Sequence, residues 1–322
     1  MPRVSARGRR RLVLALTLLL APLVTPVPVR ADEPLFGFIQ TVDLLPKGKF
    51  EVEQWATYRY KKAWGDFHVL ENRTEFSYGI TDAFQLSAYA NWNWTTSKKD
   101  GTDRKQLVAE TFAPQGVGLD PDKRFTDTRF IGVSLEGIWR LLSPYTDPVG
   151  LGILLEPTFG PDLVEFESRL LLQKNFFDDR LVIAFNFTLA QELRQLPGDN
   201  TAPPGTDEAT RHWDRETDLN LGLAVSYRFA RNWSAGWEFI NEREFSELIF
   251  WQGKYATNDA YYTGPTLHYG GKSFFFTLTG IRQLPIAQDF ANKGAASQVR
   301  GGINYADDFE KYRVRLKLGF YF

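Results

Sequence analysis

Charged side chains recur at alternate positions along several stretches of the sequence. Because successive side chains of an extended strand point to opposite faces, this spacing gathers the charges on one face. In a sheet that closes on itself, that face surrounds an interior where carboxylates, guanidiniums and amines can attract and select dissolved ions. The residues assigned to this interior are Glu51, Glu53, Arg59, Glu71, Arg73, Glu75, Arg169, Arg228, Arg313, Arg315 and Lys317. Both signs of charge occur on most of these stretches, so a salt-bridged interior that only fills space is the alternative.

Catalytic chemistry has little support in the residue types. The histidines are His68, His212 and His268, and a lipid hydrolase would need one of them paired with a hydroxyl nucleophile. Only His268 has a candidate nearby, Thr266, two residues away on the same face. The chain has no Cys, which excludes disulfides and thiolate catalysis. It shows no glycine-rich phosphate loop and no metal-ligand spacing. We therefore expect no enzyme, no cofactor and no metal site.

Twelve predicted strands hold the charged residues. Their ranges are 49–62, 66–80, 83–97, 127–142, 149–159, 162–175, 179–195, 213–230, 232–246, 258–270, 272–285 and 309–322. Several alternate strictly, and in one of them Phe185 and Phe187 occupy the opposite face from Asn186 and Thr188. This pattern predicts an all-β fold whose strands each have one apolar and one polar face.

The lengths of the predicted connections indicate how the strands are arranged. Long polar connections at 98–126, 196–212, 247–257 and 286–308 are separated from one another by short turns. Outer-membrane barrels show this asymmetry, with short periplasmic turns and long outer loops. We predict a transmembrane antiparallel up-and-down β-barrel of about 12 strands, with both termini in the periplasm. A soluble β-sandwich is the alternative, but it would not gather its long loops at one end.

Aromatic residues make up 15% of the chain, although its mean hydropathy is negative. Membrane barrels combine these properties because only alternate residues of each strand face lipid. Trp and Tyr prefer the boundary between lipid and water, where an apolar ring and a polar edge are both satisfied. The residues assigned to two such girdles on the outer face are Trp92, Trp94, Trp139, Trp233, Trp237 and Tyr321.

The last eleven residues, 312–322, alternate between apolar or aromatic side chains and basic side chains or glycine. An exposed strand of this kind would promote aggregation at its unpaired edge, whereas a strand that closes a barrel has both edges paired. The first and last strands of such a barrel are neighbours. We therefore expect Glu51 and Glu53 to face the basic row Arg313, Arg315 and Lys317 across this seam.

The beginning of the chain is typical of a secretory signal peptide. Residues 1–31 combine a basic start, a short apolar run and the small-residue site Val29-Arg30-Ala31, which predicts cleavage near Ala31. Cleavage would remove six arginines and no acids, leaving 32 basic and 39 acidic residues, a net charge near −7. That charge argues against nucleic acid as a partner. Residues 32–46 are expected to form a periplasmic or plug segment, or a short extra strand, and 47–322 the barrel.

The terminal strand, with Phe320 and Phe322, is similar to the assembly signal of bacterial outer-membrane proteins. The layout of the strands resembles porin-like and transporter barrels of that membrane. Leu44-Leu45-Pro46-Lys47-Gly48, followed by a Glu-rich strand, resembles outer-membrane channels of the meta-pathway, phenol-degradation type. This resemblance implies a location in the bacterial outer membrane, with lipid, the barrel-assembly machinery and small solutes as partners.

The resulting functional hypothesis is an outer-membrane channel or porin-like transporter in which small solutes diffuse through a charged lumen. Two alternatives stay open. The barrel could be a non-conducting structural or surface-binding protein that acts through its long loops, or it could be an outer-membrane lipid hydrolase.

Overall fold

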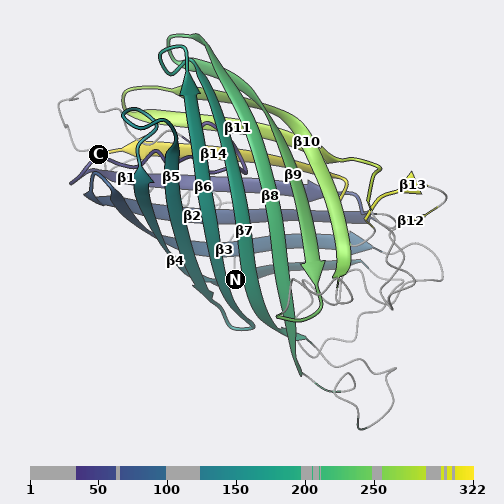
Figure 1. The fold of residues 1–322 in the computed structure, drawn as a ribbon. Coiled ribbons are helices and arrows are strands. Elements are labelled where there is room, and N and C mark those ends of the chain that lie inside the picture. Colours follow the sequence, from purple (N-terminus) through teal and green to yellow (C-terminus); the bar gives the residue numbers. More distant parts are fainter. Residues whose placement is uncertain are drawn as a thin grey trace, which may run out of the picture.

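A computed structural model describes residues 34–62, 66–98, 124–196, 205, 210, 212–248, 256–287, 299–300, 303–306 and 309–322. Within these residues the chain forms one closed antiparallel β-barrel (Figure 1). The predicted signal peptide, residues 1–31, and most of the predicted long loops lie outside the described residues. No helix in the described part of the chain is long and apolar enough to cross a membrane.

The barrel has twelve strands, which confirms the predicted antiparallel β-barrel and its strand count. The strands are β1 (Phe50–Tyr60), β2 (Asp66–Thr81), β3 (Phe84–Lys98), β4 (Phe125–Leu142), β5 (Gly150–Phe159), β6 (Leu163–Phe176), β7 (Leu181–Leu196), β8 (His212–Ala230), β9 (Trp233–Phe245), β10 (Ala256–Gly270), β11 (Phe274–Gln283) and β14 (Tyr312–Tyr321). Strands adjacent in this order pair with each other, and β14 pairs with β1 to close the barrel. The short strands β12 (Val299–Arg300) and β13 (Ile303–Asn304) form a separate two-stranded sheet.

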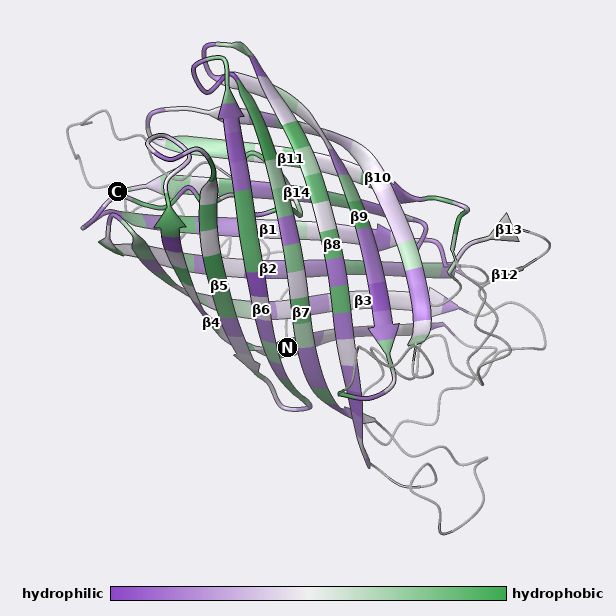
Figure 2. Cartoon of the chain, viewed as in Figure 1, coloured by the Kyte–Doolittle hydropathy of each residue, from purple (hydrophilic) through white to green (hydrophobic). Residues whose placement is uncertain are grey.

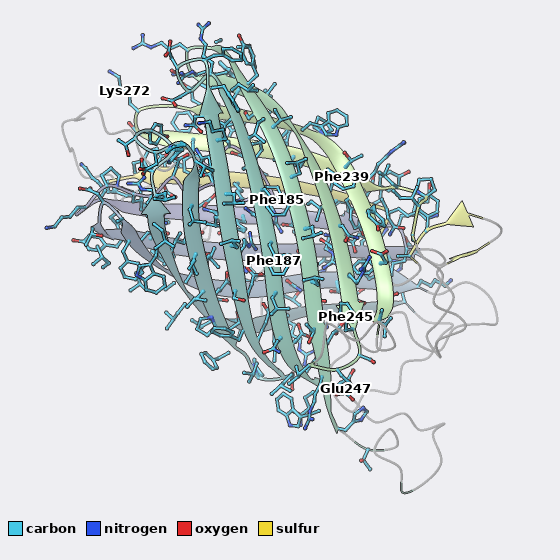
Figure 3. The ribbon with its side chains drawn as sticks, in the orientation of Figure 1. Phe185, Phe187, Phe239, Phe245, Glu247 and Lys272 are labelled. Carbon is cyan, nitrogen blue, oxygen red and sulfur yellow. The ribbon has the colours of Figure 1, made fainter. Side chains whose placement is uncertain are left out.

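The two faces of the wall have opposite character, as the alternation predicts. Phe187 and Phe239 are exposed on the outer face, whereas Asn186 and Glu238, one residue away in each strand, are buried inside. Figure 2 shows the alternation as green and purple bands along β7 and β8, and Figure 3 shows Phe185 and Phe187 on the outer surface. A polar interior inside an apolar wall is the pattern of a membrane barrel.

Five connections, all of them short, lie at one end of the barrel, here called the turn end. They join β2 to β3, β4 to β5, β6 to β7, β8 to β9 and β10 to β11. The other end, here called the loop end, has the longer connections and two short ones, between β1 and β2 and between β5 and β6. In Figure 3, Lys272 marks the turn end and Glu247 the loop end. Both ends of the barrel sheet, the start of β1 and the end of β14, lie at the turn end.

Residues 34–48, here called the N-terminal segment, precede β1 in the sequence. They lie in the lumen, surrounded by the strands of the barrel. Among them, Phe36, Val42 and Leu45 are almost completely buried. The segment turns into β1 at Gly48, whose φ of 78° is left-handed and favours glycine. The N–H of Gly48 donates to the carbonyl of Gly79 at 2.8 Å, which fixes this turn on β2.

The seam between β1 and β14 confirms the predicted neighbours and corrects the predicted contacts. Phe50 pairs with Phe322 at the turn end, and this register places Glu51 opposite Tyr321 and Glu53 opposite Gly319. The basic row lies nearer the loop end, where Lys317 is opposite Trp55. Arg315 and Arg313 are opposite Thr57 and Arg59. Glu51 and Glu53 are therefore not directly opposite the basic row, although Lys317, diagonal to Glu53 across the seam, interacts electrostatically with that carboxyl.

Candidate functional site

The charged residues assigned to the lumen fall on the inner face of the barrel. Glu51, Glu53, Glu75, Arg313 and Lys317 are buried inside. A cavity at the loop end is lined by a second group: Arg59, Glu71, Arg73, Arg169, Arg315 and, again, Lys317. Arg228 lies apart from these groups at the turn end, where it donates to the carbonyl of Asp178 at 3.1 Å.

A single carboxylate holds the start of the N-terminal segment. Glu238 of β9 accepts the backbone N–H groups of Gly37 and Phe38, each at 2.8 Å, and that of Ile39 at 3.2 Å. Thr279 of β11 donates to the same carboxylate at 2.9 Å. These N–H groups have no sheet partner, and leaving them unpaired in a buried position would be costly. The carboxylate therefore supplies the hydrogen-bond acceptors that a neighbouring strand would provide in a sheet.

Side-chain amides and a carboxylate of other strands hold the rest of the segment. The backbone N–H groups bound in this way, each with its acceptor, are Gln40 with Asn186, Val42 with Gln173, Leu45 with Gln85, and Lys47 with Asp82. The acceptors come from β7, β6, β3 and the turn between β2 and β3. Because Glu238 lies on β9, on another part of the wall, the segment crosses the bore of the barrel.

Glycines of the wall make room for the side chains of this segment. A Cβ placed at Gly222 of β8 would lie 2.1 Å from Cδ1 of Ile39. A Cβ at Gly150 of β5 would lie 2.7 Å from Cγ2 of Val42. Contacts this short do not occur between real carbon atoms. The wall is thus shaped to receive Ile39 and Val42.

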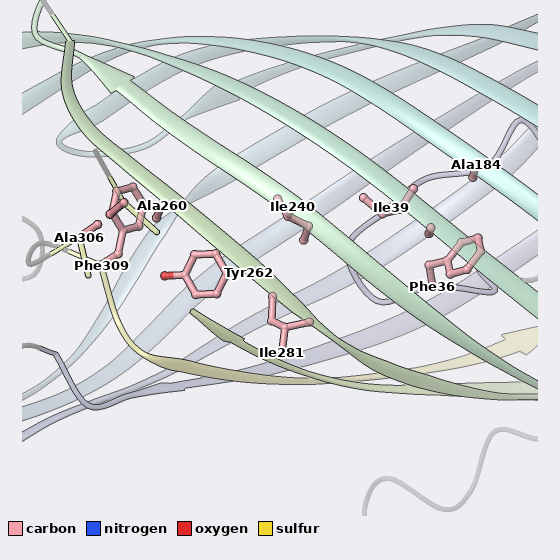
Figure 4. Packing of buried hydrophobic residues seen from close by; sticks show 11 residues of the cluster. Phe36, Ile39, Ala184, Ile240, Ala260, Tyr262, Ile281, Ala306 and Phe309 are labelled. Atoms are coloured by element: carbon pink, nitrogen blue, oxygen red, sulfur yellow. The ribbon is translucent and has the colours of Figure 1, made fainter. Parts of the chain in front are cut away.

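An apolar cluster packs the N-terminal segment against one side of the lumen. Figure 4 shows Phe36 and Ile39 near Ile240 and Ile281 of the wall. The cluster continues to Tyr262 and to Ala306 and Phe309, which precede β14. Burial of this apolar surface stabilises the segment in addition to its hydrogen bonds.

The N-terminal segment lies between two cavities of the lumen. A cavity of about 1020 Å³ lies toward the turn end, and Leu35, Asp43 and Leu44 line it. A cavity of about 400 Å³, here called the loop-end cavity, has Phe38 and Gln40 of the same segment in its lining. Burial raises the pKa of the Asp43 carboxyl, although hydrogen bonds from Tyr145 and Gln173 act in the opposite direction.

Ion pairs neutralise most of the charge around the loop-end cavity. Five pairs line it: Arg59–Glu71 at 2.6 Å, Arg73–Glu156 at 3.2 Å, Arg169–Glu167 at 2.7 Å, and the close pairs Arg129–Asp162 and Arg194–Glu192. Paired charges of this kind hold side chains in place and keep the lumen polar. They support the space-filling alternative for these particular residues.

Aromatic rings of the cavity are in contact with cations. The Lys317 ammonium lies 3.7 Å from the centre of the Trp55 ring, and Arg73 and Arg315 lie 5.0 Å and 5.2 Å from it. Arg315 also lies 4.1 Å from the centre of the Phe38 ring. Such contacts stabilise buried cations without neutralising them.

Residues 28–322 match the family model described as "Family of unknown function (DUF6662)". The chain belongs to this family. Among curated proteins, none matches the sequence. The family assignment therefore carries no activity, and the argument for function rests on the barrel itself.

Solved structures with a similar fold are outer-membrane barrels. The COG4313 outer membrane channel from Pseudomonas putida F1 matches with a TM-score of 0.55 and 10% identity, over 87% of this chain and 98% of that one. The NanC porin matches with a TM-score of 0.46 and 11% identity, over 84% and 98%. The translocator domain of the autotransporter NalP from Neisseria meningitidis matches with a TM-score of 0.48 and 8% identity, over 87% and 90%. At 10% identity, the likeness to the COG4313 channel concerns the fold alone. It shows that this chain has the fold of an outer-membrane barrel.

Most aromatic residues assigned to the girdles lie on the outer face. Trp92, Trp139 and Trp237 are exposed there, and Trp237 is the most exposed of the three at 51%. Trp94 and Trp233 are half-buried. The placement of Tyr321 is corrected: it shares the inward parity of Lys317 and Gly319, and its ring packs against that of the buried Phe275 at 5.4 Å.

His268 does not pair with Thr266, the hydroxyl that the sequence suggested. His268 is buried in the lumen, where its Nδ1 lies 2.8 Å from the Thr277 hydroxyl, which itself donates to the carbonyl of Pro34. The hydroxyl of Thr266, the candidate partner, instead lies 2.7 Å from that of Thr279. His68 contacts Tyr58 and Asp66.

A buried charge cluster at the loop end of the seam was missed by sequence analysis. Glu310, just before β14, is fully buried between Arg313, its close partner, and Arg59 at 2.7 Å. Arg313 also binds Glu242 of β9 at 2.5 Å. Burial acts to raise the pKa of Glu310, but the charges of Arg313 and Arg59 outweigh it and hold that pKa well below its usual range. Glu310 lies in the predicted strand 309–322, but it shares the parity of the exposed Val314 and Leu316, so alternation did not place it inside.

Proposed function

We propose that this protein is an outer-membrane channel for small solutes. The observation that carries the proposal is the hollow, polar interior of a closed barrel with an apolar outer wall. The cavities of about 1020 Å³ and 400 Å³ lie in line along the bore, on either side of the N-terminal segment. Dissolved small molecules can occupy spaces of this size. Solutes move by diffusion along the charged inner face.

The proposal includes an orientation and a route of assembly. The turn end faces the periplasm, as do both ends of the barrel sheet, in agreement with the short turns found there. Residues 1–31 direct export and are removed near Ala31. The barrel-assembly machinery then recognises the terminal strand through Phe320 and Phe322. Lipid surrounds the apolar wall, with Trp92, Trp139 and Trp237 at its boundaries.

The crossing of the bore by the N-terminal segment favours a second candidate, a barrel that does not conduct. The segment is held by hydrogen bonds from β9 to the turn between β2 and β3, and it separates the two cavities. In this second candidate the barrel acts through the surface of its long loops, and the polar interior only stabilises the fold.

Conductance separates the two candidates. The full-length protein, refolded and shown to be heat-modifiable on a gel, is reconstituted into planar lipid bilayers. The channel proposal expects discrete conductance steps in potassium chloride. Arg315→Glu is expected to shift the reversal potential in a salt gradient toward cation selectivity, because Arg315 lines the loop-end cavity. Bilayers that stay silent with correctly folded protein would support the non-conducting barrel.

A further inference from the structure

Four charges of the loop-end cavity are left over when the five ion pairs are set aside. They are two cations, Arg315 and Lys317, and two carboxylates, Glu136 and Glu165. Among the described residues, none of the four has an oppositely charged group within 4.0 Å. Buried or half-buried charges without a partner are costly to maintain in a fold. Here they occur in equal numbers and line the same space.

The two cations occupy neighbouring inward positions on one strand. Arg315 and Lys317 are two residues apart on β14, so both point into the lumen. Arg315 donates to the Thr57 hydroxyl at 2.7 Å and to the carbonyl of Gly37 at 3.1 Å. Lys317 lies over the Trp55 ring. These contacts orient both groups. The charge of Glu53 acts on Lys317 and that of Glu71 on Arg315, but neither acid forms an ion pair with them within 4.0 Å, so both cations can still bind an anion.

One of the two carboxylates belongs to the opposite part of the wall. Glu165 is on β6, which is the sixth strand from β14 in either direction around the barrel of twelve. Glu136 is on β4, beside Tyr89. The acids nearest Glu165 in the lining, Glu167 and Glu192, are each bound to an arginine. Across the cavity, Glu165 on β6 therefore faces the two cations of β14, whereas Glu136 on β4 also lines a small pocket that includes Lys317.

We infer that the loop-end cavity binds a small zwitterion whose ammonium and carboxylate lie at opposite ends of an extended molecule. The carboxylate binds Arg315 and Lys317, and the ammonium binds Glu165. A simple anion would leave Glu165 without a partner, and a simple cation would leave Arg315 and Lys317 without one. A ligand with both charges satisfies both sides of the cavity at once. This inference rests on the proposed channel function and names its solute class.

The width of the barrel decides between compact and extended zwitterions. Twelve strands about 4.8 Å apart, tilted by about 40°, enclose a barrel roughly 24 Å across between backbones. After side chains extend inward from both walls, the opposing charges are on the order of 10 Å apart. The charges of an α-amino acid lie too close together to reach both sides. An ω-amino acid or a short peptide can do so, and the cavity of about 400 Å³ has room for it.

Binding to the purified barrel tests this inference without requiring conductance. Isothermal titration of the full-length protein in detergent compares 6-aminohexanoate with hexanoate, pentylamine and glycine. We expect 6-aminohexanoate to bind about tenfold more tightly than each of the other three, as one additional charged contact would provide. Equal binding of 6-aminohexanoate and hexanoate would overturn the inference.

Variants locate the site. Lys317→Gln and Glu165→Gln are each expected to remove the tenfold advantage of 6-aminohexanoate. As controls, Lys47→Gln removes one positive charge and Asp178→Asn removes one negative charge, both at exposed positions of the turn end. Both controls are expected to retain the tenfold advantage of 6-aminohexanoate. Should a lumen variant fail to fold, the comparison of the four probes on the unaltered protein still decides the outcome.

The two hypotheses fail in different ways. Selective zwitterion binding by a barrel that is silent in bilayers contradicts the channel and leaves the site standing. A conducting barrel that binds all four probes equally contradicts the site and leaves the channel standing.

Discussion

The carboxylate of Glu238 accepts the backbone N–H of Gly37 at 2.8 Å, across 201 residues of sequence. Glu238 also binds the next two N–H groups of the segment, at Phe38 and Ile39. A carboxylate can accept several hydrogen bonds, and those bonds are stronger than the ones a neutral acceptor makes. One acidic side chain of the wall therefore determines where the N-terminal segment enters the bore. The segment is attached at specific points, as a plug would be.

We expect Glu238→Gln to loosen the N-terminal segment. The amide keeps one acceptor oxygen but directs an NH₂ group at backbone donors, and it loses the charge. Hydrogen bonds to charged groups contribute about 1.5–3 kcal/mol each, so the variant is expected to weaken attachment by about that amount or more. The channel proposal then expects larger or more frequent conductance steps in planar bilayers, because the segment leaves the bore more often.

Glu244→Gln is the matched control for this change. Glu244 lies on the same strand, β9, near the loop end, and pairs with Asn258 of β10. Its replacement leaves the attachment of the segment intact and is expected to leave step size and frequency close to those of the unaltered protein. Identical conductance for Glu238→Gln and Glu244→Gln would show that the segment does not obstruct the path.

A second prediction concerns the fit of Ile39 against Gly222. Any Cβ at position 222 would lie 2.1 Å from Cδ1 of Ile39, so Gly222→Ala forces that side chain out of its place. Overpacking of this kind typically costs about 1–3 kcal/mol. Shortening the opposing residue with Ile39→Ala in the same protein is expected to restore much of the loss, because the two changes share one space. Protease cleavage within residues 34–48 measures the release of the segment.

The comparison of single and double variants decides the outcome. If Gly222→Ala exposes the segment to protease and the double variant protects it again, the contact positions the segment. Additive effects of the two changes would show that Ile39 and Gly222 act independently.

Much of the barrel follows from the sequence, because alternation is a local signal that each strand repeats. The faces of Phe187 and Asn186 could be assigned by counting residues. The path of the N-terminal segment could not, since its hydrogen bonds go to side chains about 35 to 200 residues away. The seam contacts also depend on register, which a shift of a few residues would change. Tyr321 shows a further weakness: its residue type suggested a girdle, while its parity places it inside.

A third prediction addresses closure of the barrel. Phe322 donates its backbone N–H to the carbonyl of Phe50 at 2.9 Å, and the two rings lie 6.1 Å apart. Phe322→Ala removes the ring contact and retains the backbone pair. Since an aromatic pair contributes about 0.5–1.5 kcal/mol beyond its buried area, we expect a lower thermal midpoint for the transition between folded and heat-modified forms. Phe166→Ala, at an exposed outer-face position in the middle of the wall, is the control. Equal midpoints for the two variants would contradict a special role for the seam contact.

A fourth prediction follows from Glu310, whose pKa is lowered in the folded protein by Arg313 and Arg59 against the effect of burial. A carboxyl group with a lowered folded pKa stabilises the fold fully at pH values above its unfolded pKa, about 4.3. That stabilisation decreases as the pH falls below this value toward the folded pKa. Breaking a buried pair by removing one charge costs about 3–5 kcal/mol, so Glu310→Gln is expected to destabilise the protein clearly at pH 7.

Urea unfolding monitored by tryptophan fluorescence at pH 7, 5 and 3 measures this effect. The difference in stability between the unaltered protein and Glu310→Gln is expected to be largest at pH 7 and pH 5 and smaller at pH 3. Asp66→Asn provides the comparison, because Asp66 pairs with Arg124 at an exposed site, where an ion pair contributes only about 0–1 kcal/mol. A difference for Glu310→Gln that stayed constant from pH 7 to pH 3 would mean that packing, and not the charge of Glu310, stabilises the loop end of the seam.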